Sequence, residues 1–535
     1  MNQRSFVASL IFTAVLVIAG GFLTFDAFRP SPLQHALMNV EGIVALSFLA
    51  ILYARGRESE LEPPGGARGY LAVAAIVVVV SLAFAPILRS PFLYDDYTHI
   101  TDASRFTWRS VALQFGPVAG RGLFFRPVGF FFYWLNYLWA RADPEWWHAS
   151  SIALHACCSC LTYALCREVG VSRPASLGGA LLFGLSGVSA EAVAWIDARF
   201  DLMATALVLG SLIFVCRYSA TARTTWLAGA LAAGTCAMLS KESGFCLPFL
   251  IASLALFRDR KDWKRIGRAA SFAGVLAVVL FTYRWWAIGG IGGYSGAAGG
   301  LNIVRFNFVR TVDALLLRQW AVLFFPFNWS TPVGPMLRAA LAATPFVLAA
   351  CAWLARPPRR QLIGCLAFII AAGLPVQHML LISPDLSGSR ILYLGGVGWA
   401  LLWAVVLDNM ALDTMGRTPR TVAACVLLML QGWMLEHNLE AWRDTAELAR
   451  SVCVEFGQVV ASASGRVVVR GLPAIRNGAV FLQNGFPQCV EMNTGVPEGR
   501  IQMQDLGQEP GVREFTWSEA HGRIESITGA RGADR

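Results

Sequence analysis

Long apolar runs are the feature that most constrains how this chain can fold. A helix of roughly 17 to 25 apolar residues crosses a lipid bilayer, and about thirteen runs approach that length. Hydrophobic residues make up 56% of the 535 residues and charged residues 15%, and the mean hydropathy is +0.53. These values exclude an ordinary soluble protein and predict an all-α polytopic membrane protein. The predicted spans lie near 5–28, 38–54, 69–89, 146–167, 174–193, 200–217, 225–240, 243–257, 267–288, 336–355, 360–382, 391–408 and 419–437.

Basic residues are concentrated in alternate connections between these runs. Because basic connections stay on the cytoplasmic side, the N-terminus is expected to be cytoplasmic and the tail after His437 periplasmic. The pattern favours a multi-pass protein of a bacterial inner membrane. Despite a net charge of +10, no basic patch with interleaved aromatic residues suggests nucleic acid as a partner. The basic clusters are Arg55, Arg57 and Arg68; Arg167 and Arg173; Arg217 and Arg223; Arg258 to Arg268; Arg356, Arg359 and Arg360; Arg417 and Arg420.

Two further apolar segments, 124–140 and 305–327, are not counted as spans. If either one crossed the membrane, all later basic connections would move to the outer side. We expect both to lie along the outer interface as amphipathic or re-entrant helices.

After Trp442 the composition becomes that of a soluble protein. We therefore predict a transmembrane domain at 1–440 and a small extracytoplasmic α+β domain at 441–535. Cys453 and Cys489 lie in this second domain, where they form a disulfide or remain two free thiols. Strand-like runs with Gly, Pro and Asn turn signals between them are found at 466–470, 479–482, 500–503 and 514–517.

One acidic stretch, Leu93-Tyr94-Asp95-Asp96-Tyr97, opens the predicted outer loop 90–145 directly after an apolar run. In an aqueous loop, two adjacent aspartates are more often a turn or the start of a helix. Here two tyrosines flank the pair at the depth of the membrane interface. Acids and bases at one bilayer face predict a reaction site that is exposed to water, so 90–145 is expected to be the catalytic loop. The arginines that follow in this loop are Arg105, Arg109, Arg121 and Arg126.

Polar residues recur at the outer ends of several runs, and the predicted topology brings them to the same face. Some also have a structural interpretation: Lys241 and Glu242 as an interfacial ion pair, His155 as a core histidine, and Arg390 as a snorkelling side chain. The spacing of His148 and His155 differs from the four-residue spacing of a helical zinc site, so we predict no metal site. The residues are His148, His155, Glu191, Asp197, Arg199, Asp201, Lys241, Glu242, Ser389, Arg390 and Tyr393.

Six segments carry a resemblance to a known family. They are Phe92-Leu93-Tyr94-Asp95-Asp96, Phe125-Arg126-Pro127-Val128, His148 to His155, Glu191 to Asp201, Leu239-Ser240-Lys241-Glu242 and Ser389-Arg390-Ile391-Leu392-Tyr393. In this order they resemble the membrane region of TMTC-type O-mannosyltransferases, members of the GT-C superfamily of polyprenyl-phosphate-sugar glycosyltransferases. Ser186 and Ser189 stand where the family tends to have two histidines, Ser151 where it has asparagine and Ser389 where it has glutamate. No tetratricopeptide pattern is found in the chain.

The resemblance implies a GT-C-like fold and a glycosyltransferase that moves a hexosyl or pentosyl group from a polyprenyl-phosphate donor to an acceptor hydroxyl, with inversion. It implies that Asp95 is the general base and that Asp96 orients the acceptor. The residues implied to bind the donor phosphate are Arg126, Lys241 and Arg390. The residues implied to bind sugar or acceptor, or to brace the loop, are His148, His155, Glu191, Arg199, Glu242 and Tyr393.

The partners implied by this chemistry are the lipid-linked sugar, membrane lipid, and a protein, glycan or lipid acceptor. No cofactor is required for the reaction, although some relatives with this fold use a divalent cation. A lipid or solute transporter or flippase of the cell envelope is the main alternative. Transporters keep ionisable groups near the bilayer midplane, often in inverted repeats. Here Glu41 is almost the only acidic residue inside a predicted span, which favours the enzyme over the transporter. A scaffold that has lost activity is a second alternative.

Overall fold

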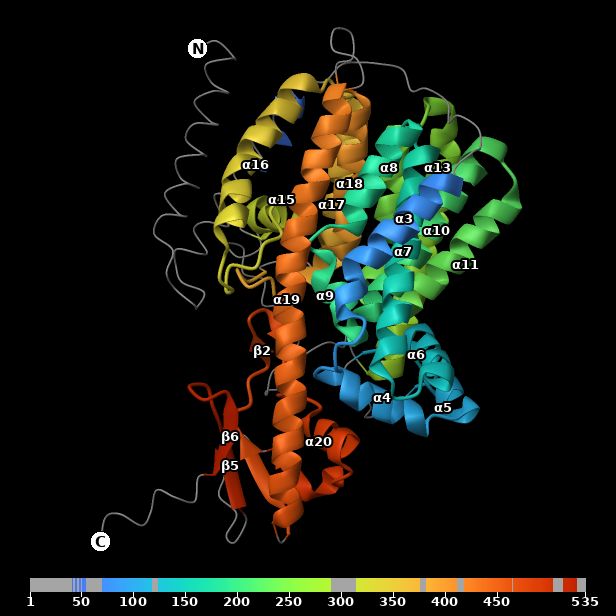
Figure 1. The fold of residues 1–535 in the computed structure, drawn as a ribbon. Coiled ribbons are helices and arrows are strands. Elements are labelled where there is room, and N and C mark those ends of the chain that lie inside the picture. Colours follow the sequence, from blue (N-terminus) through green and yellow to red (C-terminus); the bar gives the residue numbers. More distant parts are fainter. Residues whose placement is uncertain are drawn as a thin grey trace.

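The computed structural model describes residues 70–117, 124–289, 314–375, 382–410, 418–463, 465–503 and 513–526, and part of 41–53. This part of the chain is mostly helical, with a small sheet near the C-terminus (Figure 1). Six of the described helices are long and apolar enough to cross a membrane. They are α3 (Tyr70–Phe84, continued by η1, Ala85–Ile87), α7 (Pro144–Glu168), α10 (Arg199–Thr221, after η2, Ile196–Ala198), α13 (Trp263–Ile288, after η5, Arg260–Asp262), α18 (Tyr393–Asp408, after η9, Ser389–Leu392) and α19 (Thr418–Ser462).

Shorter helices complete the bundle. They are α8 (Arg173–Gly184), α9 (Ser189–Ala194), α11 (Thr224–Ser240), α12 (Leu247–Ser253, between η3, Glu242–Cys246, and η4, Leu254–Phe257), α15 (Gln319–Phe324, after η7, Ala314–Arg318), α16 (Pro335–Leu354) and α17 (Arg359–Gly373). The helical membrane architecture predicted from the sequence is present. The number of thirteen spans stays a prediction, because 5–28 lies outside the described residues and several predicted spans correspond to these shorter helices.

The burial of apolar side chains separates central from peripheral helices. In the apolar stretch of α18, 89% of the residues are buried inside the protein. The corresponding shares for α3 and α13 are 22% and 17%. The exposed residues of α13 include Val275, Val278 and Val279. Apolar surface of this extent is stable against lipid tails rather than water. α3 and α13 therefore form part of the lipid-facing surface of a multi-pass membrane protein.

The span predicted at 174–193 is wrong as a single helix, because the structure has α8 and α9 with a break between them. Gly187 lies in this break, where a Cβ atom would overlap the carbonyl oxygen of Pro326. The side-chain amide of Asn438 in α19 donates to the carbonyl oxygens of Gly187, at 3.1 Å, and Pro326, at 2.8 Å. A buried amide thus satisfies backbone groups that a continuous helix would have satisfied itself.

Several basic connections within the described residues gather at one end of the bundle. Arg217 and Arg258 come from different connections, and both pair with Glu168, at 3.2 and 3.6 Å. Arg360 comes from a third connection and donates to the carbonyl oxygens of Ala255 and Arg258, both at 2.6 Å. These connections are therefore neighbours in space, as a single membrane orientation requires.

Three short helices lie at the opposite end: α4 (Asp95–Arg105), α5 (Trp108–Leu113) and α6 (Pro127–Ala140) (Figure 1). α6 has 14 residues, which are too few to cross a bilayer. The segment 124–140 therefore does not span in this structure, as predicted. Of the second such segment, 305–313 lies outside the described residues and the remainder includes η7 and α15.

α19 is 45 residues long and continues beyond the bundle into the C-terminal region (Figure 1). The predicted boundary at residue 440 therefore falls within one unbroken helix. The elements that follow are β1 (Val467–Arg470), β2 (Ile475–Arg476), β3 (Ala479–Val480), α20 (Phe486–Thr494), η10 (Glu498–Arg500), β4 (Ile501–Met503), β5 (Arg513–Ser518) and β6 (Arg523–Ser526).

The small sheet has the strand order β4-β1-β5-β6. β1 is parallel to β4 and β5, β5 is antiparallel to β6, and β2 and β3 form a separate hairpin. Each of the four strand-like runs predicted from the sequence overlaps a strand here, so the α+β character of the C-terminal region is confirmed.

Aromatic packing and a disulfide fasten this region to α19. The ring of Phe456 in α19 lies 5.4 Å from that of Phe486 in α20 and 5.2 Å from that of Phe515 in β5. Cys453 of α19 is bonded to Cys489 of α20. Of the two states that the sequence leaves open, the structure has the disulfide, because the packing of α20 against α19 brings these cysteines together.

Candidate active site

The Asp95-Asp96 pair begins α4, at the end of the bundle away from the basic connections. Both carboxylates lie in the first turn, where the positive end of the helix dipole stabilises negative charge. The preceding residue, Tyr94, has a φ angle of 49°. Residues other than glycine rarely adopt this conformation, and strain of this kind clusters at functional sites.

Asp96 is buried, and its carboxylate is used by the fold. One oxygen accepts a hydrogen bond from the backbone N–H of Leu93, at 3.0 Å, and the other from that of Asp197, at 2.8 Å. Burial raises the pKa of Asp96 well above its usual range, although these N–H groups favour the charged form. Asp96 therefore positions the start of α4 against η2 and is not open to a substrate.

Asp95 is only half-buried, and several polar groups surround its carboxylate. Asn484, just before α20, donates a hydrogen bond from its side-chain amide to Oδ1 of Asp95. Burial, and next the charge of Asp197, raise the pKa of Asp95 to about 6, while His99, Asn484 and Arg390 act in the opposite direction. A carboxyl group with a pKa near neutrality suits a general base.

His99 lies one helical turn after Asp95 and pairs through Nδ1 with the carboxylate of Asp197. Burial disfavours the charged form of His99, but the attraction of Asp197 outweighs it and raises the pKa of His99 to about 9. At neutral pH His99 is therefore a cation next to the candidate base.

Arg390 of η9 pairs with Glu191 of α9. Oε2 of this glutamate also accepts hydrogen bonds from the backbone N–H of Arg390, at 3.0 Å, and from Oγ of Ser389, at 3.2 Å. The guanidinium carbon of Arg390 lies 4.5 Å from the centre of the Trp195 ring. Glu191 is 3% exposed and Arg390 is 18% exposed, so the cation reaches the surface and its carboxylate partner does not.

The other two predicted phosphate ligands are also ion-paired. Arg126 donates to Oε2 of Glu242 from Nε, at 3.1 Å, and from Nη2, at 2.7 Å, and Arg284 lies 3.4 Å from the same carboxylate. Nζ of Lys241 pairs with Asp201. Within the described residues, Nη1 of Arg126 and the remaining Nζ donors of Lys241 have no partner. Both cations can therefore donate to a further anion.

Arg199 and His148 brace the helices around this cluster. Nη2 of Arg199 donates to the carbonyl oxygen of Trp147, at 3.0 Å, and to Oγ of Ser151, at 3.1 Å. Nε2 of His148 lies 3.1 Å from the carbonyl oxygen of Ser90. Arg199 thus joins the start of α10 to the N-terminal half of α7, and His148 joins α7 to the segment that leads into α4.

His155 and Tyr393 lie together inside the bundle. Nδ1 of His155 is 2.6 Å from the hydroxyl of Tyr393, and Nε2 is 3.0 Å from the carbonyl oxygen of Gly184. Both side chains are buried. These contacts link α7, α18 and α8, which agrees with the structural interpretation of His155.

The structure adds further residues to the cluster, and only some had a signal in the sequence. Asp197 and Asp201 are among the polar residues predicted at this face. The position of His99 one turn after Asp95 could have indicated it once a helix was assumed. Arg284 and Asn484 come from elements far along the chain, and no local pattern points to either.

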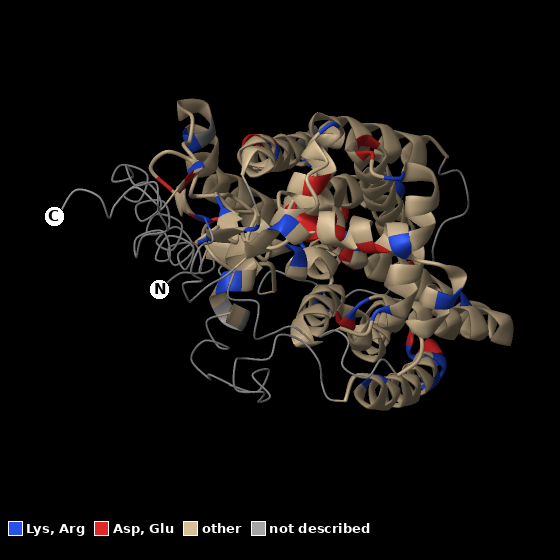
Figure 2. Cartoon of the chain, turned by 90° about the horizontal axis from the view of Figure 1, so that it is seen from below, with Lys and Arg blue, Asp and Glu red and all other residues tan. Residues whose placement is uncertain are grey.

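Acidic and basic residues lie close together near the middle of this end of the molecule (Figure 2). Across the part of the chain that the structure describes, no group of three or more His, Cys, Asp or Glu side chains could hold a metal ion. The cluster instead combines carboxylates with Arg and Lys, which are suited to binding phosphate.

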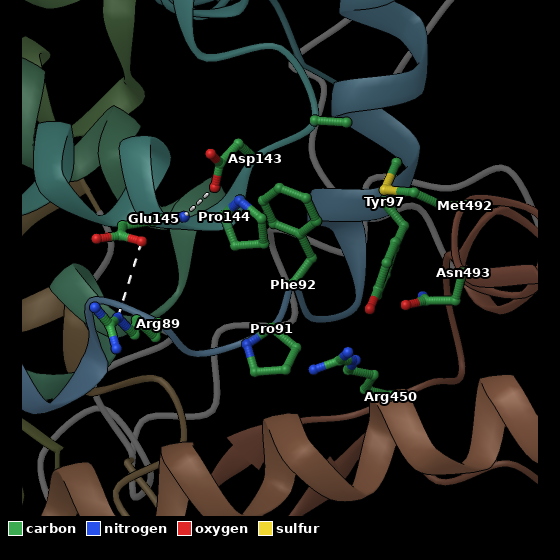
Figure 3. A pocket seen from close by; sticks show the side chains of 11 residues that line it. Arg89, Pro91, Phe92, Tyr97, Asp143, Pro144, Glu145, Arg450, Met492 and Asn493 are labelled. Atoms are coloured by element: carbon green, nitrogen blue, oxygen red, sulfur yellow. Dashed lines mark hydrogen bonds and ion pairs between the residues drawn. The ribbon is translucent and has the colours of Figure 1, made fainter.

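A cavity of about 330 Å³ lies at this end of the molecule, between the segments that lead into α4 and α7 and the C-terminal region (Figure 3). On one side, Arg89 and Glu145 are 3.9 Å apart. On the other side, the hydroxyl of Tyr97 points toward Asn493 of α20 and Arg450 of α19 (Figure 3). A cavity of this volume is at the lower end of the range for small-molecule sites.

Comparison with known proteins finds relatives of one kind. The chain is 22% identical over 459 residues to Protein O-mannosyl-transferase TMTC1 of Homo sapiens, which covers 72% of this chain and 51% of that protein. It is 25% identical over 397 residues to Protein O-mannosyl-transferase TMTC4 of Homo sapiens, with coverages of 61% and 53%. The chain thus spans about half the length of the curated relatives it matches. No protein-family model matches the chain.

Among solved structures, ArnT from Cupriavidus metallidurans bound to undecaprenyl phosphate matches with a TM-score of 0.41 and 14% identity. The match covers 85% of this chain and 94% of that chain. The two sequence matches cover 72% and 61% of this chain. This chain is therefore a homologue of the TMTC protein O-mannosyl-transferases.

Proposed function

We propose that the chain is a membrane glycosyltransferase of the GT-C type, which moves a sugar from a polyprenyl-phosphate donor to an acceptor hydroxyl. The observation that carries this proposal is a half-buried carboxylate, Asp95, at the end of the bundle where Arg126, Lys241 and Arg390 are held by carboxylate partners. Transfer from a phosphate donor needs a base for the hydroxyl and a cation for the leaving group. The names of the relatives make mannose the first sugar to test.

In the proposed reaction, Asp95 accepts the proton of the acceptor hydroxyl. The hydroxyl oxygen attacks the anomeric carbon from the face opposite to the phosphate, so a new glycosidic bond forms with inversion. The bond between the anomeric carbon and the phosphate oxygen breaks, and its electron pair leaves with the polyprenyl phosphate. Asp96 holds the first turn of α4 in place, so that Asp95 keeps its position during this step.

Arg126, Lys241 and Arg390 are proposed to bind the donor phosphate. Each cation has a carboxylate partner from the protein. These partners hold the cations in place before the donor arrives, which limits the reorganisation needed to stabilise the leaving anion. With this donor set the phosphate can be held without a divalent cation, so we expect transfer to continue in the presence of a chelator.

The site is proposed to face the periplasm, with the N-terminus in the cytoplasm of a bacterial cell. Two observations support this orientation. The Cys453–Cys489 disulfide belongs to the same end of the molecule as α4, and disulfides persist in oxidising compartments. The basic connections that the structure describes lie at the other end, where cytoplasmic loops are expected. We likewise propose a catalytic membrane domain at 1–440 and a C-terminal domain at 441–535, joined by α19.

Labelling from outside the cell tests this orientation. A cysteine introduced at exposed Asp102 in α4 is expected to react with a membrane-impermeant maleimide in intact cells, whereas one introduced at exposed Arg223 is expected to react only after lysis. A variant without the ten free cysteines serves as background. The opposite pattern would place the site in the cytoplasm and refute the proposed donor geometry.

The transfer rate is expected to depend on pH through Asp95. The pKa of Asp95 is raised to about 6, and only the deprotonated form can accept a proton. Below about pH 6, kcat/KM should therefore fall roughly tenfold for each pH unit, and above that pH it should reach a plateau. A rate that stays constant between about pH 5 and 8 would contradict the role of this carboxylate as base.

The proposed function is tested with the purified protein in proteoliposomes. Labelled polyprenyl phosphate mannose, and other polyprenyl phosphate sugars, are supplied together with a peptide, a glycan or a lipid acceptor. The expected result is a glycosylated acceptor and an equal amount of released polyprenyl phosphate. If the labelled lipid instead changes leaflet without losing its sugar, the chain is a flippase.

A further inference from the structure

The turn between β2 and β3 packs against the loop that leads to Arg390. The amide of Asn328 donates to the carbonyl oxygen of Asn477 in this turn, at 2.7 Å. The next residue, Gly478, has a φ angle of +82°, and a Cβ atom there would overlap the carbonyl oxygen of Asp385. The turn thus approaches the loop so closely that only glycine fits.

A second contact, a few residues later, is made with the loop that carries Asp95. Gly485 has a φ angle of +74°, and a Cβ atom there would overlap the carbonyl oxygen of Tyr94. Asn484, the residue before it, donates its amide hydrogen bond to the carboxylate of Asp95. One short segment of the C-terminal region therefore contacts both loops of the candidate site.

The elements around this segment hold it in place. α20 begins directly after Gly485 and is tied to α19 by the Cys453–Cys489 disulfide. Beyond α20, Glu498 pairs with Arg105 at the end of α4, at 3.1 Å. The C-terminal region thus contacts α4 at both ends, and the position of Asn484 relative to Asp95 is determined by this packing.

We propose that Asn484 is a positioning residue for the catalytic base, supplied by a C-terminal region that completes the active site. The inference rests on the proposed function, because it requires that Asp95 accept a proton. An amide N–H directed at one carboxylate oxygen restricts rotation of the side chain and leaves the other oxygen for the acceptor hydroxyl. It also favours the charged form of the carboxylate.

Other charged groups around Asp95 also act on its ionisation. Asp197 of η2 opposes ionisation of Asp95, while His99 of α4 and Arg390 of η9 favour it. Asp96 is adjacent in the chain, but its carboxylate is directed to backbone N–H groups. The amide of Asn484 is the hydrogen-bond donor to Asp95 among these groups. The acid limb of the rate profile is the pH range in which the rate falls as Asp95 becomes protonated. Without the hydrogen bond from Asn484, this limb moves to higher pH.

The test replaces Asn484 by alanine and follows transfer by the full-length protein from the labelled donor. Loss of a hydrogen bond to the charged base is expected to lower kcat about 10- to 100-fold. The KM for the lipid donor is expected to change less than about twofold, because the side-chain hydrogen bond of Asn484 is made to the base and not to the donor phosphate. The acid limb is expected to move up by about half a pH unit or more.

Gln483 provides a matched control. It is adjacent to Asn484, is also exposed, and its side chain has no hydrogen bond within the described residues. Gln483→Ala is expected to retain the wild-type rate and profile. Asn484→Gln keeps the amide on a longer side chain and is expected to recover part of the rate and to move the acid limb back.

The outcomes separate this inference from the proposed function. If the wild-type protein transfers sugar and Asn484→Ala has the wild-type rate, the positioning role is overturned and the proposed function stands. A lower rate with an unmoved acid limb also overturns it, because the residue would then act on structure and not on Asp95. If the wild-type protein itself transfers no sugar from any donor, the proposed function fails first.

Discussion

The Asp95→Asn variant is expected to lose sugar transfer by about 10²- to 10⁴-fold, which is the usual contribution of a general base. Asparagine has nearly the same shape as aspartate but cannot accept the proton of the acceptor hydroxyl. The native carboxylate is half-buried, and removing its charge leaves no cation buried without a partner, since His99 still pairs with Asp197. Expression, membrane insertion and the KM for the lipid donor should therefore stay close to the wild-type values.

Two other aspartates of α4 show whether this effect is specific. Asp102 is exposed on the same helix, and Asp102→Asn is expected to retain activity. Asp96→Asn should act through stability, because the replacement cannot accept both hydrogen bonds from Leu93 and Asp197; a loss of about 1–3 kcal/mol is expected. Transfer assays and thermal melting of the detergent-purified proteins measure both effects. An Asp95→Asn protein that transfers sugar at the wild-type rate would end the proposed mechanism.

The second large effect is expected for Arg390→Ala. Loss of a guanidinium that holds the donor phosphate should raise the KM for the lipid donor about 10- to 100-fold. The same change also leaves Glu191 buried without its cation, which typically costs 3–5 kcal/mol in stability. The single variant therefore combines two effects, and a fall in protein yield alone would support the view that Arg390 only snorkels to the interface.

A double variant separates binding from stability. In Arg390→Ala combined with Glu191→Gln, the buried charge is removed with its partner, so most of the stability should return. Gln keeps an acceptor oxygen for the backbone N–H of Arg390 and for Ser389. The KM for the donor should remain high, because no phosphate ligand has been restored. If the double variant also recovers the wild-type KM, Arg390 has no role in donor binding.

The membrane architecture could be predicted because it depends on local sequence. A run of apolar residues is stable in lipid wherever it lies in the chain, and alternating basic connections follow from topology. The strands of the C-terminal region could be predicted for the same reason, since their β-branched residues and turn signals are contiguous. The break at Gly187 could not be predicted, because it is stabilised by Asn438 from a helix about 250 residues later.

The candidate site, like the fold, could be predicted only in part. Asp95, Arg126, Lys241 and Arg390 were identifiable because each lies at the polar end of an apolar run, where an ionisable residue is costly without a function. The sequence was therefore sufficient to identify the set of charged groups and the membrane face at which they are expected.

How these groups pair depends on the packing of the folded chain. It directs Asp96 toward the backbone and Asp95 toward the surface, joins His99 to Asp197, and brings Asn484 from the C-terminal region to Asp95. These pairings depend on how distant helices pack, and periodicity carries no information on which residues of distant elements meet. A hydrogen bond between residues 389 positions apart in the chain exists only because the fold brings its two ends together.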